Sequence, residues 1–152
     1  MRIVIAAVGR GGSDPGQIVY DHYAHRIAFP LTLKEVAVKR QMSGPTLQRA
    51  EAELLLRAVP EGAVLIALDE SGRLLSSPDF ARRIGDWRDQ SVRDLAFVIG
   101  GADGLDASVL AAAKLVLSLG PMVWPHFLVR GMLAEQLYRA QTILAGHPYH
   151  RG

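Results

Sequence analysis

A glycine-rich loop is the first candidate for chemistry in this chain of 152 residues. The five apolar residues Leu95–Ile99 predict a strand that is buried on both faces. Gly100, Gly101 and Gly104 follow within five positions. Strand, glycine loop and helix start, with Asp106 as helix cap, are the arrangement that holds a nucleotide-like ligand at the carboxyl end of a parallel sheet. The same glycines suit a tight turn with positive φ angles, so both interpretations are open.

The tail of the chain is a second candidate, because it combines aromatic, imidazole and cationic side chains. Its four functional residues are His147, Tyr149, His150 and Arg151. Together they offer a stacking surface, hydrogen-bond donors and a positive charge, which suits a nucleic-acid base extruded from its stack. The alternative is an ordinary polar tail that frays like most termini.

The composition excludes other kinds of site. The chain has no cysteine, which rules out disulfides, zinc–thiolate centres and a thiol nucleophile. His22 and His25 have no third ligand near them in the sequence, so we predict no metal. No apolar run approaches the ~18 residues of a membrane span. The first residues predict a strand and not a targeting leader, so we expect a cytoplasmic protein with no membrane partner.

Charge is distributed unevenly along the chain, although the net charge is only +2. Residues 1–60 carry eight basic and five acidic groups, and residues 61–106 carry five and nine. Residues 107–152 carry four basic groups and one acidic group. Basic ends beside an acidic middle indicate a polyanionic partner.

The hydrophobic pattern indicates the elements that must position these residues. We expect strands at Arg2–Val8, Leu31–Lys39, Ala63–Leu68, Leu95–Ile99 and Leu115–Leu119, with a turn at Asp69–Gly72. We expect helices at 16–28, from Pro45 to before Pro60, from Pro78 with Ser77 as its cap, at Ala107–Ala113 and at His126–Ala145. Alternating strands and helices, with strands that lack polar faces, predict an α/β fold. This fold is a parallel sheet with helices on both faces, in one domain over residues 1–152.

Motifs over essentially the whole chain resemble one family. They are Leu68-Asp69, Ile99-Gly100-Gly101-x-x-Gly104-Leu105, Leu117-Ser118-Leu119, Pro125-His126-x-x-Val129-Arg130, Glu135-Gln136-x-Tyr138-Arg139-Ala140 and His147-Pro148-Tyr149-His150-Arg151. This set resembles the RlmH family, the bacterial 23S rRNA pseudouridine N3-methyltransferases of the SPOUT superfamily. The resemblance implies a deep C-terminal trefoil knot, in which the last segments thread through a loop. Where the family usually has Lys-Glu-Gly, this chain has Ala50-Glu51-Ala52.

The resemblance implies S-adenosylmethionine as the cofactor, held in the knot by three loops. The matching residues are Leu68 and Asp69, then Gly100 and Gly101, then Leu119, Gly120, Pro121, Met122, Val123 and Trp124. Glycines let the backbone approach a ligand closely, and the apolar third loop could enclose adenine. Pro121 removes one amide donor from that loop.

The resemblance also implies roles for the C-terminal residues. The candidates for binding 23S rRNA are Arg130, Arg139, His147 and Arg151. For Arg139, an ion pair with Glu135 at i, i+4 is the structural alternative. The candidate catalytic residues are Tyr149, His150 and Arg151. Tyr149 would stack on the flipped base, and either His150 accepts the N3 proton or Arg151 stabilises the developing anion.

Two further expectations concern partners. Apolar residues on more than one face of the last helix predict a homodimer, in which each tail reaches the site of the neighbouring protomer. These residues are Phe127, Leu128, Met132, Leu133, Leu137, Ile143 and Leu144. The family implies the assembled 70S ribosome as the substrate, although the sequence does not distinguish it from free rRNA or the 50S subunit. The alternative function is a non-enzymatic α/β module that binds a nucleotide or RNA.

Overall fold

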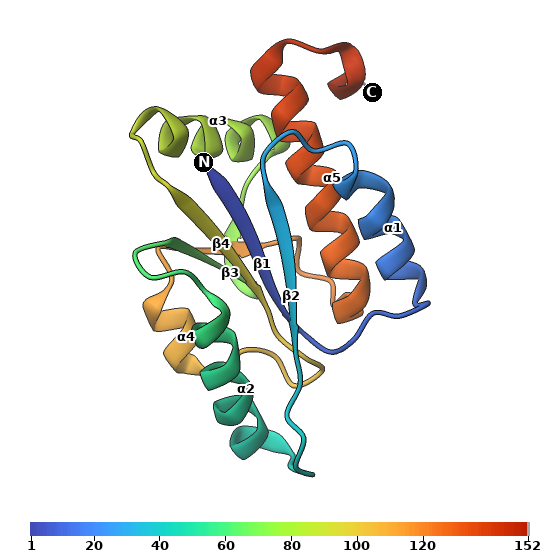
Figure 1. The fold of residues 1–152 in the computed structure, drawn as a ribbon, viewed down its shortest axis with the longest axis vertical. Coiled ribbons are helices and arrows are strands. Elements are labelled where there is room, and N and C mark those ends of the chain that lie inside the picture. The colour runs from blue at the N-terminus through green and yellow to red at the C-terminus, as the bar shows by residue number, and fades with distance from the viewer. Residues whose placement is uncertain (152) are drawn as a thin grey trace.

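The computed structural model describes residues 1–151 and contains a five-stranded parallel sheet with helices on both faces (Figure 1). The strands are β1 (Arg2–Val8), β2 (Leu31–Val36), β3 (Val64–Leu74), β4 (Asp94–Ile99) and β5 (Leu115–Ser118). They lie in the order β2-β1-β4-β3-β5, and each neighbouring pair is parallel. The predicted α/β class with a parallel sheet is therefore confirmed.

Five helices cover the two faces of this sheet. They are α1 (Pro15–Ala24), α2 (Gly44–Ala58), α3 (Ser77–Asp89), α4 (Ala107–Ala112) and α5 (His126–Ala145). Helices α1, α3 and α5 pack on one face, and α2 and α4 pack on the other. Because both faces of the central strand are covered, every residue of β4 is buried. This double burial explains why the apolar run in β4 is continuous and not alternating.

Several element boundaries differ from the predicted ones by a few residues, and three of the differences have a clear physical cause. Strand β2 ends at Val36 and not at Lys39, because its only partner, β1, ends opposite it at Val8. Helix α1 ends at Ala24 although the apolar pattern continues to Ile27, whose side chain packs against the core from the following loop. Ser76, and not Ser77, caps α3, because its hydroxyl oxygen accepts the backbone N–H of Asp79 at 3.1 Å.

Strand β3 continues past the position where we expected the chain to turn. Leu68 and Arg73 both pair with Leu117 of β5, so residues 69–72 bulge out between them. The Asp69 carboxylate accepts the backbone N–H of Ser71 at 3.0 Å, which makes a local turn inside the strand. The predicted turn is therefore only local, and the strand resumes after it.

Helices α1 and α5 cross with their backbones in contact. A Cβ added to Gly16 would lie 2.3 Å from the carbonyl oxygen of Phe127. A Cβ added to Gly131 would lie 2.9 Å from the carbonyl oxygen of Gly16. Glycine is required at both positions, because any larger residue would push the two helices apart.

Helix α5 connects the two ends of the molecule (Figure 1). It begins at His126 beside the carboxyl edge of the sheet and runs past the opposite edge, where the tail forms a 3-10 turn at Pro148–His150. Its 20 residues span ~30 Å at ~1.5 Å per residue. Within residues 1–151, no helix is both long enough and apolar enough to cross a membrane.

Candidate functional site

A cavity of about 870 Å³ opens at the carboxyl edge of the sheet, where three loops meet. Of the predicted cofactor residues, those that line it are Leu68, Asp69, Gly100, Gly101, Leu119, Gly120, Met122, Val123 and Trp124. Pro121 lies in the third loop but does not line the cavity. Loops that are far apart in the sequence are thus brought together because β3, β4 and β5 are neighbours in a parallel sheet.

The glycine loop after β4 uses its glycines in two different ways. At Gly100 a Cβ would lie 2.9 Å from the carbonyl carbon of Gly104, so a side chain has no room there. Gly104 has a φ of +80°, and its N–H donates to the carbonyl oxygen of Gly101 at 3.0 Å. The close approach and the positive φ that the sequence left as alternatives are therefore both present, at different glycines.

The buried face of this loop rests on helix α2. The Gln48 side-chain amide donates to the carbonyl oxygen of Asp103. Glu51 lies beneath Gly101, where a Cβ would come within 3.0 Å of the carboxylate. Glu51 is buried, and its Oε1 has no hydrogen-bond partner among the described residues. Burial, with the nearby Asp103 charge, raises the pKa of the Glu51 carboxyl group.

The third loop presents apolar side chains at the mouth of the cavity. Met122 is 69% exposed, Val123 is 80% exposed and Trp124 is 38% exposed. The Ser118 hydroxyl fixes the start of this loop, because its oxygen accepts the N–H of Gly120 at 3.1 Å. An exposed apolar cluster at a cavity mouth suits contact with an aromatic or apolar group of a ligand.

The charge of the cavity is negative. Asp69, Glu70 and Asp103 line it, and the described lining contains no lysine or arginine. The single histidine in the described lining is His126, whose pKa is lowered by burial and by the neighbouring Arg130 charge. A lining with three carboxylates and no cation favours a positively charged ligand over a phosphate.

The tail residues lie at the other end of α5 and do not line this cavity. The Tyr149 hydroxyl donates to the Glu135 carboxylate at 3.1 Å, and its ring centroid is 4.7 Å from that of Tyr138. Arg139 pairs with Glu135 at 2.6 Å, as its i, i+4 spacing allows, and its guanidinium carbon is 5.2 Å from the Tyr149 ring centroid. Within one chain, the candidate catalytic residues and the candidate cofactor residues therefore do not meet.

The two tail histidines differ in their surroundings. The ring Nδ1 of His147 accepts the backbone N–H of Tyr149 at 3.2 Å, which caps the short 3-10 turn. The ring Nδ1 of His150 is buried and has no partner among residues 1–151. Arg151 is exposed.

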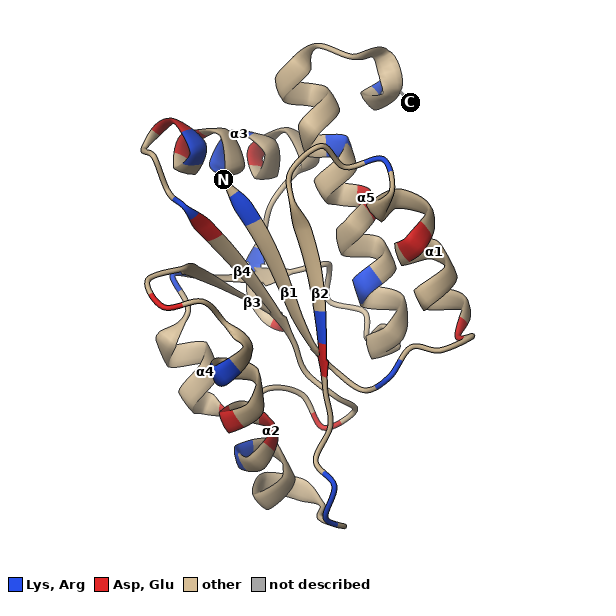
Figure 2. Cartoon of the chain, in the orientation of Figure 1, with Lys and Arg blue, Asp and Glu red and all other residues tan. Residues whose placement is uncertain are grey.

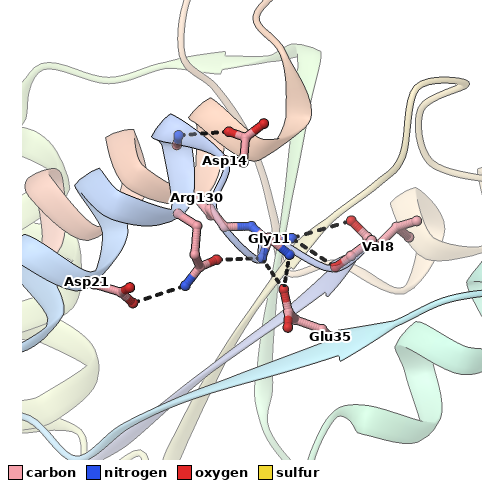
Figure 3. A network of polar contacts seen from close by, with 9 residues as sticks. Val8, Gly11, Asp14, Asp21, Glu35 and Arg130 are labelled. Carbon is pink, nitrogen blue, oxygen red and sulfur yellow. Dashed lines mark hydrogen bonds and ion pairs between the residues drawn. The ribbon is translucent and has the colours of Figure 1, made fainter.

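Arg130, a candidate for binding RNA, lies inside the protein (Figure 3). Its side chain is completely buried, so it cannot contact an RNA phosphate in this conformation. One guanidinium nitrogen donates to Glu35 at 2.6 Å and to Gln17 at 2.9 Å. The other donates to the carbonyl oxygen of Gly9 at 3.2 Å. Arg130 is therefore a structural cation that joins α5 to α1, to β2 and to the loop after β1.

Sequence reasoning missed several residues at this site. They are Gln48 and Glu51 on α2, Glu70 and Asp103 in the cavity loops, and Gln17 and Glu35 around Arg130. Two of these residues could have been found from their position in the sequence. Glu70 directly follows the predicted cofactor residue Asp69, and Asp103 lies inside the glycine motif. No such signal marks Glu35, because its partner Arg130 is 95 positions away. Residues 1–151 contain no group of three His, Asp or Glu side chains placed to hold a metal ion.

Known proteins resemble this chain in sequence and in fold. A family model described as "Predicted SPOUT methyltransferase" matches residues 1–150. Ribosomal RNA large subunit methyltransferase H of Rhodospirillum centenum is 60% identical over 151 residues, which cover 99% of each chain. In fold alone, the structure of a probable methylase family protein from Haemophilus influenzae is similar, with a TM-score of 0.56 at 13% identity, over 99% of this chain and 70% of that one. A putative methyltransferase from Legionella pneumophila, solved with bound SAM, has a TM-score of 0.50 at 14% identity, over 92% and 66% of the two chains.

Proposed function

This chain belongs to the SPOUT methyltransferase family, and we propose that it transfers a methyl group from S-adenosylmethionine to N3 of a pseudouridine in 23S rRNA. The 60% identical relative is named a ribosomal RNA large subunit methyltransferase, which supports rRNA as the substrate. The observation that carries the proposal is the acidic cavity of about 870 Å³ at the carboxyl edge of the sheet. A non-enzymatic binding module is the weaker alternative, because the family is one of enzymes.

S-adenosylmethionine fits both the charge and the lining of this cavity. When bound, it supplies the methyl group from a cationic sulfonium, and it also carries an ammonium group. Asp69, Glu70 and Asp103 give the lining the opposite charge, and the apolar Met122 and Val123 offer a surface for adenine. From the family we also infer that the C-terminal segments form a deep trefoil knot around this site.

A homodimer is the second part of the proposal, and the exposed apolar surface supports it. Leu133 and Leu137 are core residues, so they add nothing to an interface. Met132 instead lines a groove of about 530 Å³ between α1, α3 and α5, together with Val19 and Leu74. Leu74 is 68% exposed beside this groove. An apolar groove of this kind suits burial against a second copy of the chain.

Dimerisation would also bring a tail next to a cavity, which a single chain keeps far apart. Because α5 holds its two ends ~30 Å apart, the tail of one protomer cannot reach its own cavity without unfolding the helix. We propose that the tail serves the cavity of the neighbouring protomer. Tyr149 would then leave its contact with Glu135 to stack on the flipped base, while His147, Arg139 and Arg151 contact the RNA.

The chemistry asks mainly for positioning. The accepting nitrogen must lie in line with the transferred carbon and its leaving group, so the two proposed halves of the site act by orientation. The N3 proton must leave as well. Either the His150 ring accepts it, after the change in the tail has exposed its buried and unpartnered Nδ1, or Arg151 stabilises the anion that forms.

The test is methyl transfer to ribosomes that contain pseudouridine. The chain is incubated with labelled S-adenosylmethionine and with 70S ribosomes, 50S subunits or free 23S rRNA, and the product nucleoside is identified by mass spectrometry. We expect N3-methylpseudouridine with 70S ribosomes. Calorimetry measures cofactor binding separately. Binding without methyl transfer to any of the three substrates would contradict the proposal and favour a non-enzymatic module.

A further inference from the structure

We propose that the loops at the carboxyl edge of β1 and β2, with the first half of α2, bind the phosphodiester backbone of the rRNA. This inference rests on the proposed function, because it names the surface that holds the substrate of that site. The phosphate-binding side chains are Arg10, Lys39, Arg40 and Arg49, which we call the basic rim. Figure 2 shows Lys and Arg positions on both loops that leave this edge of the sheet.

The sheet itself brings the two loops together. Strands β1 and β2 are paired in register up to Val8 and Val36, so both end at the same level. The backbone N–H of Gly9 then donates to the carbonyl oxygen of Val36 at 2.8 Å. Arg10 is the next residue after Gly9. Lys39 lies three residues after Val36, in the loop that follows β2. Their side chains are exposed.

The backbone around Arg10 is fixed before any ligand arrives (Figure 3). On one side of Arg10, the Gly9 carbonyl oxygen accepts a hydrogen bond from the buried Arg130 at 3.2 Å. On the other side, the Gly11 N–H donates to the Glu35 carboxylate at 2.6 Å. Glu35 also pairs with Arg130, so its charge is already compensated. A cation on an anchored loop loses less conformational entropy when it binds, which raises its affinity for phosphate.

Helix α2 connects the basic rim to the cavity. Gln48 lines the cavity and donates to the Asp103 carbonyl oxygen, and the exposed Arg49 is the next residue along the helix. Hydrogen bonds from Ser108, with a smaller contribution from the Arg49 charge, lower the pKa of Asp106 at the start of α4. A phosphate bound at Arg49 would thus lie next to the mouth of the cavity, where a flipped nucleotide must enter.

The four cations of the basic rim form no ion pair within residues 1–151, a property that they share with exposed cations elsewhere such as Arg93 and Lys114. Arg2, Arg82, Arg88 and Arg139 each pair with a carboxylate of the chain. None of the four rim cations forms an ion pair with any described residue. The cavity beside them is acidic, so the two surfaces select ligands of opposite charge. Cations without ion pairs, gathered along one edge of the sheet, suit a polyanion that spans several phosphates.

The test compares two double charge reversals. Lys39→Glu with Arg40→Glu changes the basic rim. Arg93→Glu with Lys114→Glu is the matched control, because both residues form no ion pair within the described chain and lie at the amino ends of β4 and β5. Both variants should keep the wild-type melting temperature and affinity for S-adenosylmethionine. The readout is the KM for the ribosomal substrate, measured across a range of salt concentrations.

We expect the rim variant to raise KM at least ~30-fold at low salt with little change in kcat. We also expect it to flatten the log–log salt dependence by ~0.7–0.9 for each phosphate that the variant no longer neutralises. The control should change neither quantity. Equal effects of the two variants, or no effect of either, would overturn the proposal.

If the wild-type chain methylates no rRNA, the proposed function fails by itself. In that case, fluorescence anisotropy with a labelled rRNA hairpin tests RNA binding by the basic rim separately. The proposal then holds only if the rim variant loses binding and the control variant does not.

Discussion

The two ends of helix α5 differ in how their polar groups are satisfied. At the cavity end, Glu51 is buried beneath the glycine loop with one carboxylate oxygen unpartnered among the described residues, and the loop side chains at the mouth are exposed. At the tail end, Glu135 accepts hydrogen bonds from Arg139, Gln136 and Tyr149. The cavity end is thus organised to receive a ligand, whereas at the tail end the Glu135 carboxylate is already occupied by contacts within the chain and His150 Nδ1 is the unpartnered buried atom among the described residues.

This difference indicates that the tail must change its contacts before it can act. Tyr149 cannot stack on a base while its ring packs on Tyr138 and its hydroxyl bonds to Glu135. A partner protomer or the RNA would have to replace those contacts. Four predictions test the division between the two ends, in order of decreasing effect.

The largest effect should come from separating the two ends onto different chains. Truncation after Gly146 and Gly101→Val should each abolish methyl transfer, the first at the tail and the second at the cavity. After subunit exchange in an equal mixture, half of the dimers are mixed and each holds one intact composite site. We therefore expect about a quarter of the wild-type activity to return. If exchange is demonstrated and the mixture stays inactive, each tail serves its own chain.

Gly101→Val should act at the cavity end alone. Its Cβ would meet the Glu51 carboxylate at 3.0 Å and the Val8 side chain at 3.1 Å, so the loop that lines the cavity would have to shift. We expect affinity for S-adenosylmethionine to fall at least ~100-fold, or about 2.7 kcal/mol, in calorimetry. Gly12→Asn is the control, because this glycine has open space around it and a φ of +51° that asparagine tolerates. Unchanged affinity in folded Gly101→Val would remove this loop from the cofactor site.

Arg130→Met should destabilise the fold without altering the tail. It leaves Glu35 without its cation and the carbonyl oxygens of Val8 and Gly9 without a donor. Because the Glu35 side chain is 33% exposed, we expect a loss of about 2–3 kcal/mol in the free energy of unfolding, below the range for a fully buried pair. Urea denaturation measures this loss. Adding Glu35→Gln should recover part of it, and an unchanged midpoint for Arg130→Met would contradict the structural role.

The smallest effects should come from replacing two carboxylates, Glu51 and Glu135, with glutamine. The two replacements should change the stability of the protein in opposite directions. The raised pKa of Glu51 means that its ionisation favours the unfolded chain, so native stability falls as pH rises above the ordinary value of 4.5. Glu51→Gln should therefore stabilise the protein at pH 7, and the gain should vanish below about pH 4. Glu135→Gln should destabilise it at pH 7, because Arg139 loses its partner. Thermal melts of both variants at several pH values give the comparison, and equal signs at pH 7 would refute it.

The sequence predicted local features well and long-range pairs poorly. The buried run at β4, the Asp106 cap and the i, i+4 pair of Glu135 and Arg139 follow from neighbouring residues, and the structure confirms them. The family motifs named the three loops that meet at the cavity. The burial of Arg130 could not be foreseen, because its partners come from α1, β2 and the end of β1, far away in the sequence. The length of α5 was predicted, but its consequence for the tail became clear only when the cavity was located.

The bulge in β3 has a consequence for protein engineering. Residues 69–72 leave the ladder after Leu68, and the strand resumes pairing with β5 at Arg73. The pairing on either side holds the bulge at both ends. At Gly72 a Cβ would lie 2.6 Å from the Val116 carbonyl oxygen, so this position has no room for a side chain. Libraries of variants that aim to accept analogues of S-adenosylmethionine should therefore vary residues 69–71 and keep Gly72.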